Sequence, residues 1–303
     1  MALHKPPSGA KVKLREQVPQ SAPTPRKKWA APGGEWARSE WAQRALGAAL
    51  VIVCILPGIY FGGWVWDTVA SLIALGSLME LYKLLQSKHR ISKGWGLAGG
   101  VAILVFVSLN FSYALSLSTI TLVAMLVLFT EIVRRQSSGV SYALSNVGGT
   151  IFGLVYIVLP WSFMILIRSA TNGHIFLFTI FLCTWSCDTA ANVIGSRWGS
   201  TPFCSKVSPK KSWEGFWAGF FASLICGSVL PIYFDFPPMP LVLLGTICGI
   251  AGQFGDLGES VLKREAGVKD TGSVIPGHGG FLDRFDSILI NASIAFFIIE
   301  SVS

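Results

Sequence analysis

The sequence predicts an all-α, polytopic integral membrane protein with about nine transmembrane helices and a cytosolic N-terminus. Of its 303 residues, 52% are hydrophobic and only 13% are charged, and the mean hydropathy is +0.57. Soluble domains carry about 25% charged residues. Long apolar segments recur along the chain, and the basic residues concentrate in alternate connections between them. These observations exclude an ordinary soluble globular protein.

Residues 1–44 differ in composition from the rest of the chain. They are rich in Pro, Lys and Arg and contain no apolar run, which predicts a disordered basic tail on the cytosolic side. A secretory signal would need a short apolar core and a cleavage site, whereas the low acidic content keeps an organelle transit peptide as an alternative. The net charge of +8 needs no nucleic-acid partner, because anionic membrane lipids explain basic loops beside a bilayer.

Apolar segments of roughly spanning length follow one another from residue 45 to the C-terminus. Each is expected to be helical, since a spanning helix satisfies its own backbone hydrogen bonds. Only a few residues, around 110–112, divide the third from the fourth. The predicted segments are 45–61, 64–84, 94–110, 113–130, 147–167, 174–195, 213–233, 240–258 and 285–302.

The distribution of Lys and Arg supports nine segments rather than eight. With nine, every one of the 24 Lys and Arg residues except Arg168 falls on the cytosolic side. Fusing the third and fourth segments would move the loops at 196–212 and 259–284 outside and remove this asymmetry. We therefore expect both of these loops, which carry most of the polar motifs, to face the cytosol.

Two polar motifs precede the eighth apolar segment. Asp188 lies in WSCDTAAN near the end of the sixth segment, and its alternative role is a carboxylate bonded to a neighbouring backbone. The second motif, SPKKSWEG, places Lys210 and Lys211 where a loop meets a helix. Paired lysines beside helix N-terminal amides suit phosphate groups. An ordinary basic cytosolic loop is the alternative for this motif.

The third and longest motif runs from Asp256 to Asp286. Asp256, Glu259 and Lys263 share a helical spacing before a glycine-rich loop, and Asp283 and Asp286 follow it at a spacing of three. Carboxylates from two facing helices could hold Mg²⁺ together with substrate phosphates and water. The alternative is a salt-bridge network among the charged side chains of this motif.

Other ionisable residues receive weaker expectations. His278, in PGHGG, could orient a phosphate or a metal ligand, or could hold the loop. Asp67, Glu80 and Glu131 lie near the ends of apolar segments, so we expect them to reach water and assign none of them to catalysis.

At these motifs the chain resembles the phosphatidate cytidylyltransferases, also called CDP-diacylglycerol synthases. The resemblance covers residues 185–290 and includes the Asp-Thr-x-Ala and SPKKSWEG elements. Asn192 is a departure, since the family pattern has an aromatic residue there. The long motif is matched at Ser260, Lys263, Arg264, Lys269, Asp270, His278, Gly279, Gly280, Asp283, Arg284 and Asp286.

The resemblance implies transfer of CMP from CTP to phosphatidate, which yields CDP-diacylglycerol and pyrophosphate. It makes 45–303 a transmembrane catalytic domain whose site is built mainly from 185–290, with Mg²⁺ as the cofactor and a second cation as an option. The implied residues are, for catalysis, Asp188, Lys263, His278, Asp283 and Asp286; for the metal, Asp256, Asp283 and Asp286; and for the substrates, Ser208, Lys210, Lys211, Glu214, Ser260, Arg264, Lys269, Asp270, Gly279, Gly280 and Arg284.

Two other functions compete with this interpretation. One is a CTP-dependent kinase or cytidylyltransferase that acts on another lipid, such as a polyprenol, phytol or an archaeal-type lipid. The other is a transporter, although the charges gather at one face instead of mid-membrane. A bacterial plasma membrane is the expected location, with a plastid membrane as the alternative. Glycine-rich segments make a homodimer a reasonable expectation.

Overall fold

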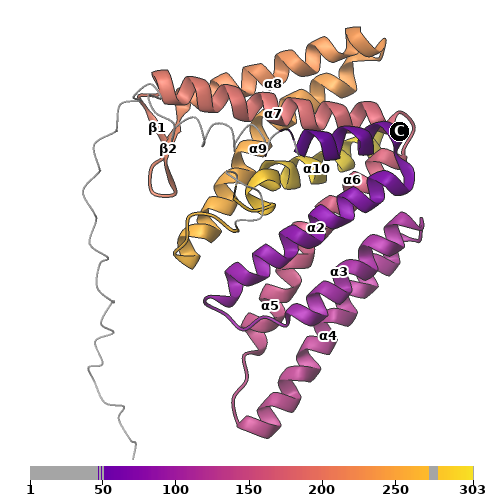
Figure 1. Ribbon diagram of the computed structural model, residues 1–303, viewed down its shortest axis with the longest axis vertical. Coiled ribbons are helices and arrows are strands. Elements are labelled where there is room, and N and C mark those ends of the chain that lie inside the picture. Colours follow the sequence, from indigo (N-terminus) through magenta and orange to yellow (C-terminus); the bar gives the residue numbers. More distant parts are fainter. Residues whose placement is uncertain (1–46, 48, 50, 273–278, 303) are drawn as a thin grey trace, which may run out of the picture. The chain divides into compact units, whose positions relative to one another are not determined.

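The computed structural model describes residues 47, 49, 51–272 and 279–302 of the chain. The predicted basic tail and His278 lie outside these residues. The described part is a bundle of helices with one small hairpin (Figure 1). After a short apolar helix at Val51–Phe61, the helices are α2 (Gly63–Gln86), α3 (Lys93–Ser108), α4 (Tyr113–Ser138), α5 (Ala143–Gly153), α6 (Leu159–Ser169), α7 (Gly173–Trp198), α8 (Trp213–Phe234), α9 (Pro238–Ala266) and α10 (Leu282–Val302).

These helices confirm the all-α, polytopic membrane fold. Six described helices are long and apolar enough to cross a bilayer, namely α2, α4, the continuous helix Ala143–Ser169, α7, α8 and α9. Val51–Phe61 and α3 are apolar but shorter, and α10 occupies the place of the last predicted segment. The count of nine spans and the cytosolic N-terminus remain predictions.

The helix Ala143–Ser169 contains a π-helical turn, η1 (Leu154–Val158), between α5 and α6. A π-helical turn inserts one extra residue per turn and is frequent at functional sites. It carries Tyr156, whose hydroxyl is buried and forms no hydrogen bond among the described residues. The π-helical turn was not predicted, because one such turn does not visibly change the pattern of apolar residues in the sequence.

A short hairpin precedes α8 and was not predicted either. Strands β1 (Pro202–Cys204) and β2 (Ser208–Ser212) pair antiparallel, and β2 is the SPKKS part of the motif. Phe203 packs edge-on against Trp213, with 4.5 Å between ring centroids. The Ser212 hydroxyl accepts a hydrogen bond from the Gly215 N–H and so caps α8. The hairpin thus holds the lysine pair against the start of α8.

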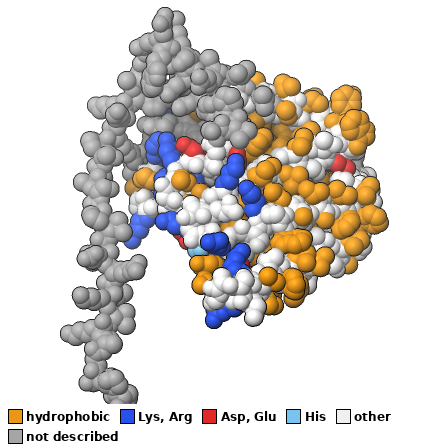
Figure 2. Space-filling view, turned by 60° about the horizontal axis from the view of Figure 1, so that its bottom comes forward, with side chains coloured by type: hydrophobic (Ala, Val, Ile, Leu, Met, Phe, Trp, Pro, Cys, Tyr) orange, Lys and Arg blue, Asp and Glu red, His pale blue; other side chains and the backbone are white. Residues whose placement is uncertain are grey.

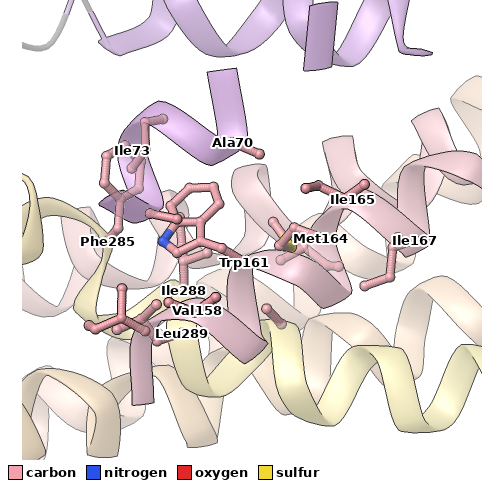
Figure 3. Close-up of a cluster of buried hydrophobic side chains, with 14 of the residues drawn as sticks. Ala70, Ile73, Val158, Trp161, Met164, Ile165, Ile167, Phe285, Ile288 and Leu289 are labelled. Carbon is pink, nitrogen blue, oxygen red and sulfur yellow. The ribbon is translucent and has the colours of Figure 1, made fainter. Parts of the chain in front are cut away.

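Two kinds of packing fix the helices that bear the polar motifs. The buried cluster in Figure 3 joins α2, α6 and α10, with Trp161 edge-on to Phe285 at 5.3 Å between centroids. The Trp66 indole on α2 also donates to the Met164 carbonyl on α6, at 3.0 Å. Between α9 and α10 the contact is backbone to backbone, since a Cβ on Gly255 would lie 2.6 Å from the Asp286 carbonyl oxygen.

Candidate active site

Three carboxylates converge where α9 meets α10. Asp256 and Glu259 lie one turn apart on α9, and Asp286 lies in the second turn of α10. One oxygen from each comes within 4.8 Å of the others. Glu259 and Asp286 are buried, while Asp256 is partly exposed, so the group opens to one side. The close approach at Gly255 brings the two helices near enough for this convergence.

The donor set fits a hard divalent cation. Carboxylate oxygens are the ligands that Mg²⁺ takes in proteins. Glu259 Oε1 is buried and has no hydrogen-bond donor among the described residues, so this oxygen is available to a cation. Three carboxylates this close repel one another unless positive charge lies among them. The sequence analysis chose Asp256 and Asp286 for this role but missed Glu259, although its spacing of three from Asp256 was visible.

Two lysines from different elements contact the carboxylate group. Lys211 Nζ, from β2, lies 3.0 Å from Asp256 Oδ2 and donates to the Gln253 carbonyl at 2.9 Å. Lys263 Nζ, on α9, lies 2.8 Å from Glu259 Oε2. The hairpin therefore brings one half of the predicted phosphate-binding pair directly to the carboxylates.

Asp283 lies outside this three-carboxylate group. Its Oδ1 accepts from Lys263 Nζ at 2.8 Å. Its Oδ2 accepts from the Thr271 N–H and hydroxyl and from the Gly280 N–H, each at 2.9 Å. Four donors thus occupy the carboxylate that was predicted to bind metal. These contacts favour a different task, in which Asp283 ties both ends of the glycine-rich loop to the start of α10.

Glu80 joins this region from α2, which the sequence analysis did not anticipate. Its Oε2 accepts from the Leu282 N–H at 2.9 Å and from the Thr271 hydroxyl at 3.4 Å. Gly272 and Gly280 pack against the same carboxylate so closely that neither has room for a Cβ. The expectation that Glu80 and Glu131 reach water is wrong, because they are only 3% and 2% exposed. Glu80 instead anchors the loop and the first turn of α10.

The other predicted residues of the hairpin and α9 lie around this centre. Glu214 accepts from the Ser200 hydroxyl at 2.5 Å and from the Thr201 N–H at 3.0 Å, so its carboxylate holds the hairpin in place. Arg264 Nε donates to the Val207 carbonyl at 3.4 Å, which links the end of α9 to the hairpin. Lys210 is exposed on β2.

The remaining predicted residues fall into near and peripheral sets. Asp188, on α7, is within electrostatic range of Asp256, Asp286 and Lys211. Ser260 donates to Asp256 Oδ1 at 3.4 Å. Ser208 lies on β2, Lys269 and Asp270 lie on the loop after α9, and Gly279 and Arg284 lie just before and at the start of α10, where Arg284 is within electrostatic range of Asp188.

Tyr156 is a second residue that the sequence analysis missed. From the π-helical turn it interacts electrostatically with Asp286, Glu259 and Asp256. Its buried hydroxyl therefore lies within electrostatic range of the carboxylate group, on a helix other than α9 and α10. No motif marks this position, and only the three-dimensional arrangement reveals it.

Comparisons with known proteins identify the family of the chain. Residues 42–302 match the Cytidylyltransferase family. The phosphatidate cytidylyltransferase of Staphylococcus aureus (strain COL) is 31% identical over 250 residues, which cover 81% of this chain and 94% of that protein. The enzymes of the same name from Staphylococcus saprophyticus and Bacillus subtilis (strain 168) are 32% and 30% identical, over 81% and 76% of this chain and 94% and 87% of their own lengths. With nearly the whole helical region matched, the chain belongs to the cytidylyltransferase family.

Proposed function

We propose that this protein transfers CMP from CTP to phosphatidate in a bacterial plasma membrane, giving CDP-diacylglycerol and pyrophosphate. One observation carries the proposal: three carboxylates converge within 4.8 Å between lysines from two different elements. Carboxylates, lysines and a divalent cation are the groups that handle a nucleoside triphosphate. Relatives that bear the phosphatidate cytidylyltransferase name cover most of the chain.

The reaction is a displacement at phosphorus. A phosphate oxygen of phosphatidate forms a bond to the α-phosphorus of CTP, and the bond from that phosphorus to the oxygen bridging to the β-phosphorus breaks. Pyrophosphate leaves with the electron pair. Such a transfer needs little covalent chemistry from the protein, which contributes mainly alignment and charge stabilisation.

Asp256, Glu259 and Asp286 would hold the cation, for which we propose Mg²⁺, with a second cation as an option. When bound, Mg²⁺ would neutralise phosphate charge on the triphosphate and on the leaving pyrophosphate. Glu259 is well arranged as a ligand, because Lys263 fixes one carboxylate oxygen and no described residue donates to the other.

The basic side chains around the carboxylates would bind the phosphates. Lys211 and Lys210 on β2 and Arg264 at the end of α9 bring positive charge from two elements that meet at the Arg264–Val207 contact. Lys263 is buried between two carboxylates, so we assign it to positioning Glu259 and Asp283. His278 is proposed to act on the phosphates from the glycine-rich loop, and Asp188 to complete the acidic centre from α7.

The test uses the purified full-length chain with Mg²⁺ and CTP labelled at the α-phosphorus, offered phosphatidate, dolichol-type polyprenol or phytol in mixed micelles. We expect labelled lipid with phosphatidate alone, together with one pyrophosphate released per lipid labelled. Transfer of label from γ-labelled CTP would instead indicate a lipid kinase. Absence of any labelled lipid, with binding or transport intact, would refute the enzymatic proposal.

A pair of variants tests the carboxylate group within the same assay. Asp286→Asn should remove CMP transfer while the protein keeps its thermal stability and elution profile. Asp235→Asn is the matched control, because Asp235 is exposed at the far end of α8 and its left-handed backbone suits Asn. Near-normal turnover in Asp286→Asn would contradict the metal assignment.

A further inference from the structure

A basic pocket of about 300 Å³ lies between the loop after α2 and the junction of α4 and α5. Its lining comes from the last turn of α2, the following loop, α4 and α5. None of its lining residues belongs to the carboxylate group described above. The six lining residues are Gln86, His89, Arg90, Ile91, Arg134 and Asn146.

The lining offers donors and no carboxylate. Arg90, Arg134 and His89 provide cationic or neutral N–H groups, and Gln86 and Asn146 provide amides. Arg90 is exposed, and among the described residues it forms no ion pair and makes only a cation–π contact, with its guanidinium carbon 5.3 Å from the centre of the Tyr142 ring. A cavity with several fixed N–H donors and an unneutralised guanidinium is suited to a phosphate group.

A buried carboxylate holds two of these donors in place. Glu131 accepts from the Tyr142 N–H and from the Asn146 amide, each at 2.7 Å, and also pairs with Arg134. These contacts orient Arg134 and Asn146 from two different helices. Glu131 thus acts as an internal scaffold that pre-organises a binding surface, which lowers the entropy lost on binding.

The helices around the pocket also present an apolar surface. Two of the helices that line the pocket carry strongly exposed hydrophobic side chains, with Leu144 on α5 at 81% and Ile132 on α4 at 65%, and the exposed aromatic rings of Trp95 and Tyr142 lie close by in the chain. Tryptophan and tyrosine favour the head-group level of a bilayer. Figure 2 shows Lys and Arg side chains gathered on one part of the molecule, next to a broad hydrophobic surface.

We propose that this pocket binds the head-group phosphate of an anionic membrane phospholipid. Basic pockets between the ends of transmembrane helices are established binding places for such head groups. A lipid is favoured over a soluble anion because its acyl chains could lie along the exposed apolar surface that α4 and α5 also carry. The pocket also lies at the same end of α2 as Glu80, so a bound lipid would brace the helix that anchors the catalytic loop.

The test measures binding of dioctanoyl phosphatidylglycerol to the purified full-length chain in a neutral detergent, by native mass spectrometry and by thermal shift. Dioctanoyl phosphatidylcholine and inorganic phosphate are run in parallel. We expect phosphatidylglycerol to bind most tightly, and Arg90→Gln to weaken it by about tenfold or more, the size of one charge-assisted hydrogen bond. Arg135→Gln is the matched control, because Arg135 is exposed beside Arg134 and does not line the pocket.

Each other outcome would overturn the proposal. Equal binding by wild type and Arg90→Gln would place the lipid elsewhere, for example at the carboxylate site. An equal loss in Arg135→Gln would mean that surface charge alone attracts the lipid. If inorganic phosphate protects as well as phosphatidylglycerol at the same concentration, the pocket binds a soluble anion. Failure of the CMP-transfer assay would leave these binding results unaffected, so the two proposals can fail separately.

Discussion

Replacing Lys263 with methionine tests the electrostatic core of the site. Methionine keeps most of the side-chain volume but removes the charge that lies 2.8 Å from both Glu259 and Asp283. Lys263 is 13% exposed and its partners are 0% and 6% exposed, so neither carboxylate can turn to water. Removing one partner of a buried ion pair costs about 3–5 kcal/mol. At roughly 2–4 °C per kcal/mol for a chain of this size, we expect Tm to fall by roughly 6–20 °C.

Most of the lost stability should come from the unpaired charge of Glu259. Asp283 keeps three other donors when Lys263 is removed, namely two from Thr271 and one from Gly280. Glu259 would keep none that the described residues provide. The double variant Lys263→Met/Glu259→Gln should therefore be more stable than Lys263→Met alone, which is a coupling that a double-mutant cycle measures directly.

Thermal unfolding in detergent without added divalent cation is the assay. Lys83→Met, at an exposed lysine on α2, is the control and should change Tm little, since surface substitutions usually stay within about 0.5 kcal/mol. If Lys263→Met unfolds near the wild-type temperature, the lysine does not neutralise the two carboxylates. If adding Glu259→Gln to Lys263→Met does not raise Tm, the lost stability does not come from the charge of Glu259.

Three further variants probe how the site is assembled. Glu80→Ala should lower kcat and destabilise the fold by about 1–3 kcal/mol, because it leaves the buried Leu282 N–H without a partner. Glu80→Gln keeps an acceptor and should retain most of kcat. Equal kcat for the two variants would argue against a role of Glu80 in positioning the loop. Gly255→Ala should force α9 from α10 and lower both Tm and Mg²⁺ affinity, while Gly258→Ala, whose Cβ would meet only the Tyr156 hydroxyl at 4.0 Å, should not. Tyr156→Phe should leave Tm unchanged, because the hydroxyl forms no hydrogen bond among the described residues. It should lower kcat by about tenfold, the effect of losing one hydrogen bond to the substrate. An unchanged kcat would assign the side chain to packing alone.

Spacing along one helix was readable from the sequence, and contacts between distant elements were not. Asp256, Glu259 and Lys263 at intervals of three and four must share a face of any helix that contains them. The structure also brings Asp286 to that face, as expected for the carboxylate of a following helix. By contrast, 202 residues separate Glu80 from Leu282, and no local pattern connects an acidic residue near the end of one apolar segment to a loop before another.

Hydropathy also misled the sequence analysis about buried acids. A carboxylate within about a turn of a segment end normally reaches water, so Glu80 and Glu131 were given no role. Both instead accept hydrogen bonds from groups distant in the sequence or one turn away: the Leu282 N–H and the Thr271 hydroxyl for Glu80, and a backbone N–H, an amide and a guanidinium for Glu131. A buried charge persists where hydrogen bonds replace its hydration. Such carboxylates can be recognised only when their donors are known in space.

Asp283 and Asp286 show how helix position can separate two residues that share a motif. Asp283 lies in the first turn of α10, where backbone N–H groups have no carbonyl partner within the helix and attract a carboxylate. There it accepts hydrogen bonds from the Thr271 and Gly280 N–H groups of the loop. Asp286 lies one turn further in, where the loop no longer reaches and α9 comes closest through Gly255. The same residue type at a spacing of three therefore organises the loop in one case and joins the acidic centre in the other. Equal spacing on a helix face predicts proximity, but the end of the helix decides which partners each carboxylate finds.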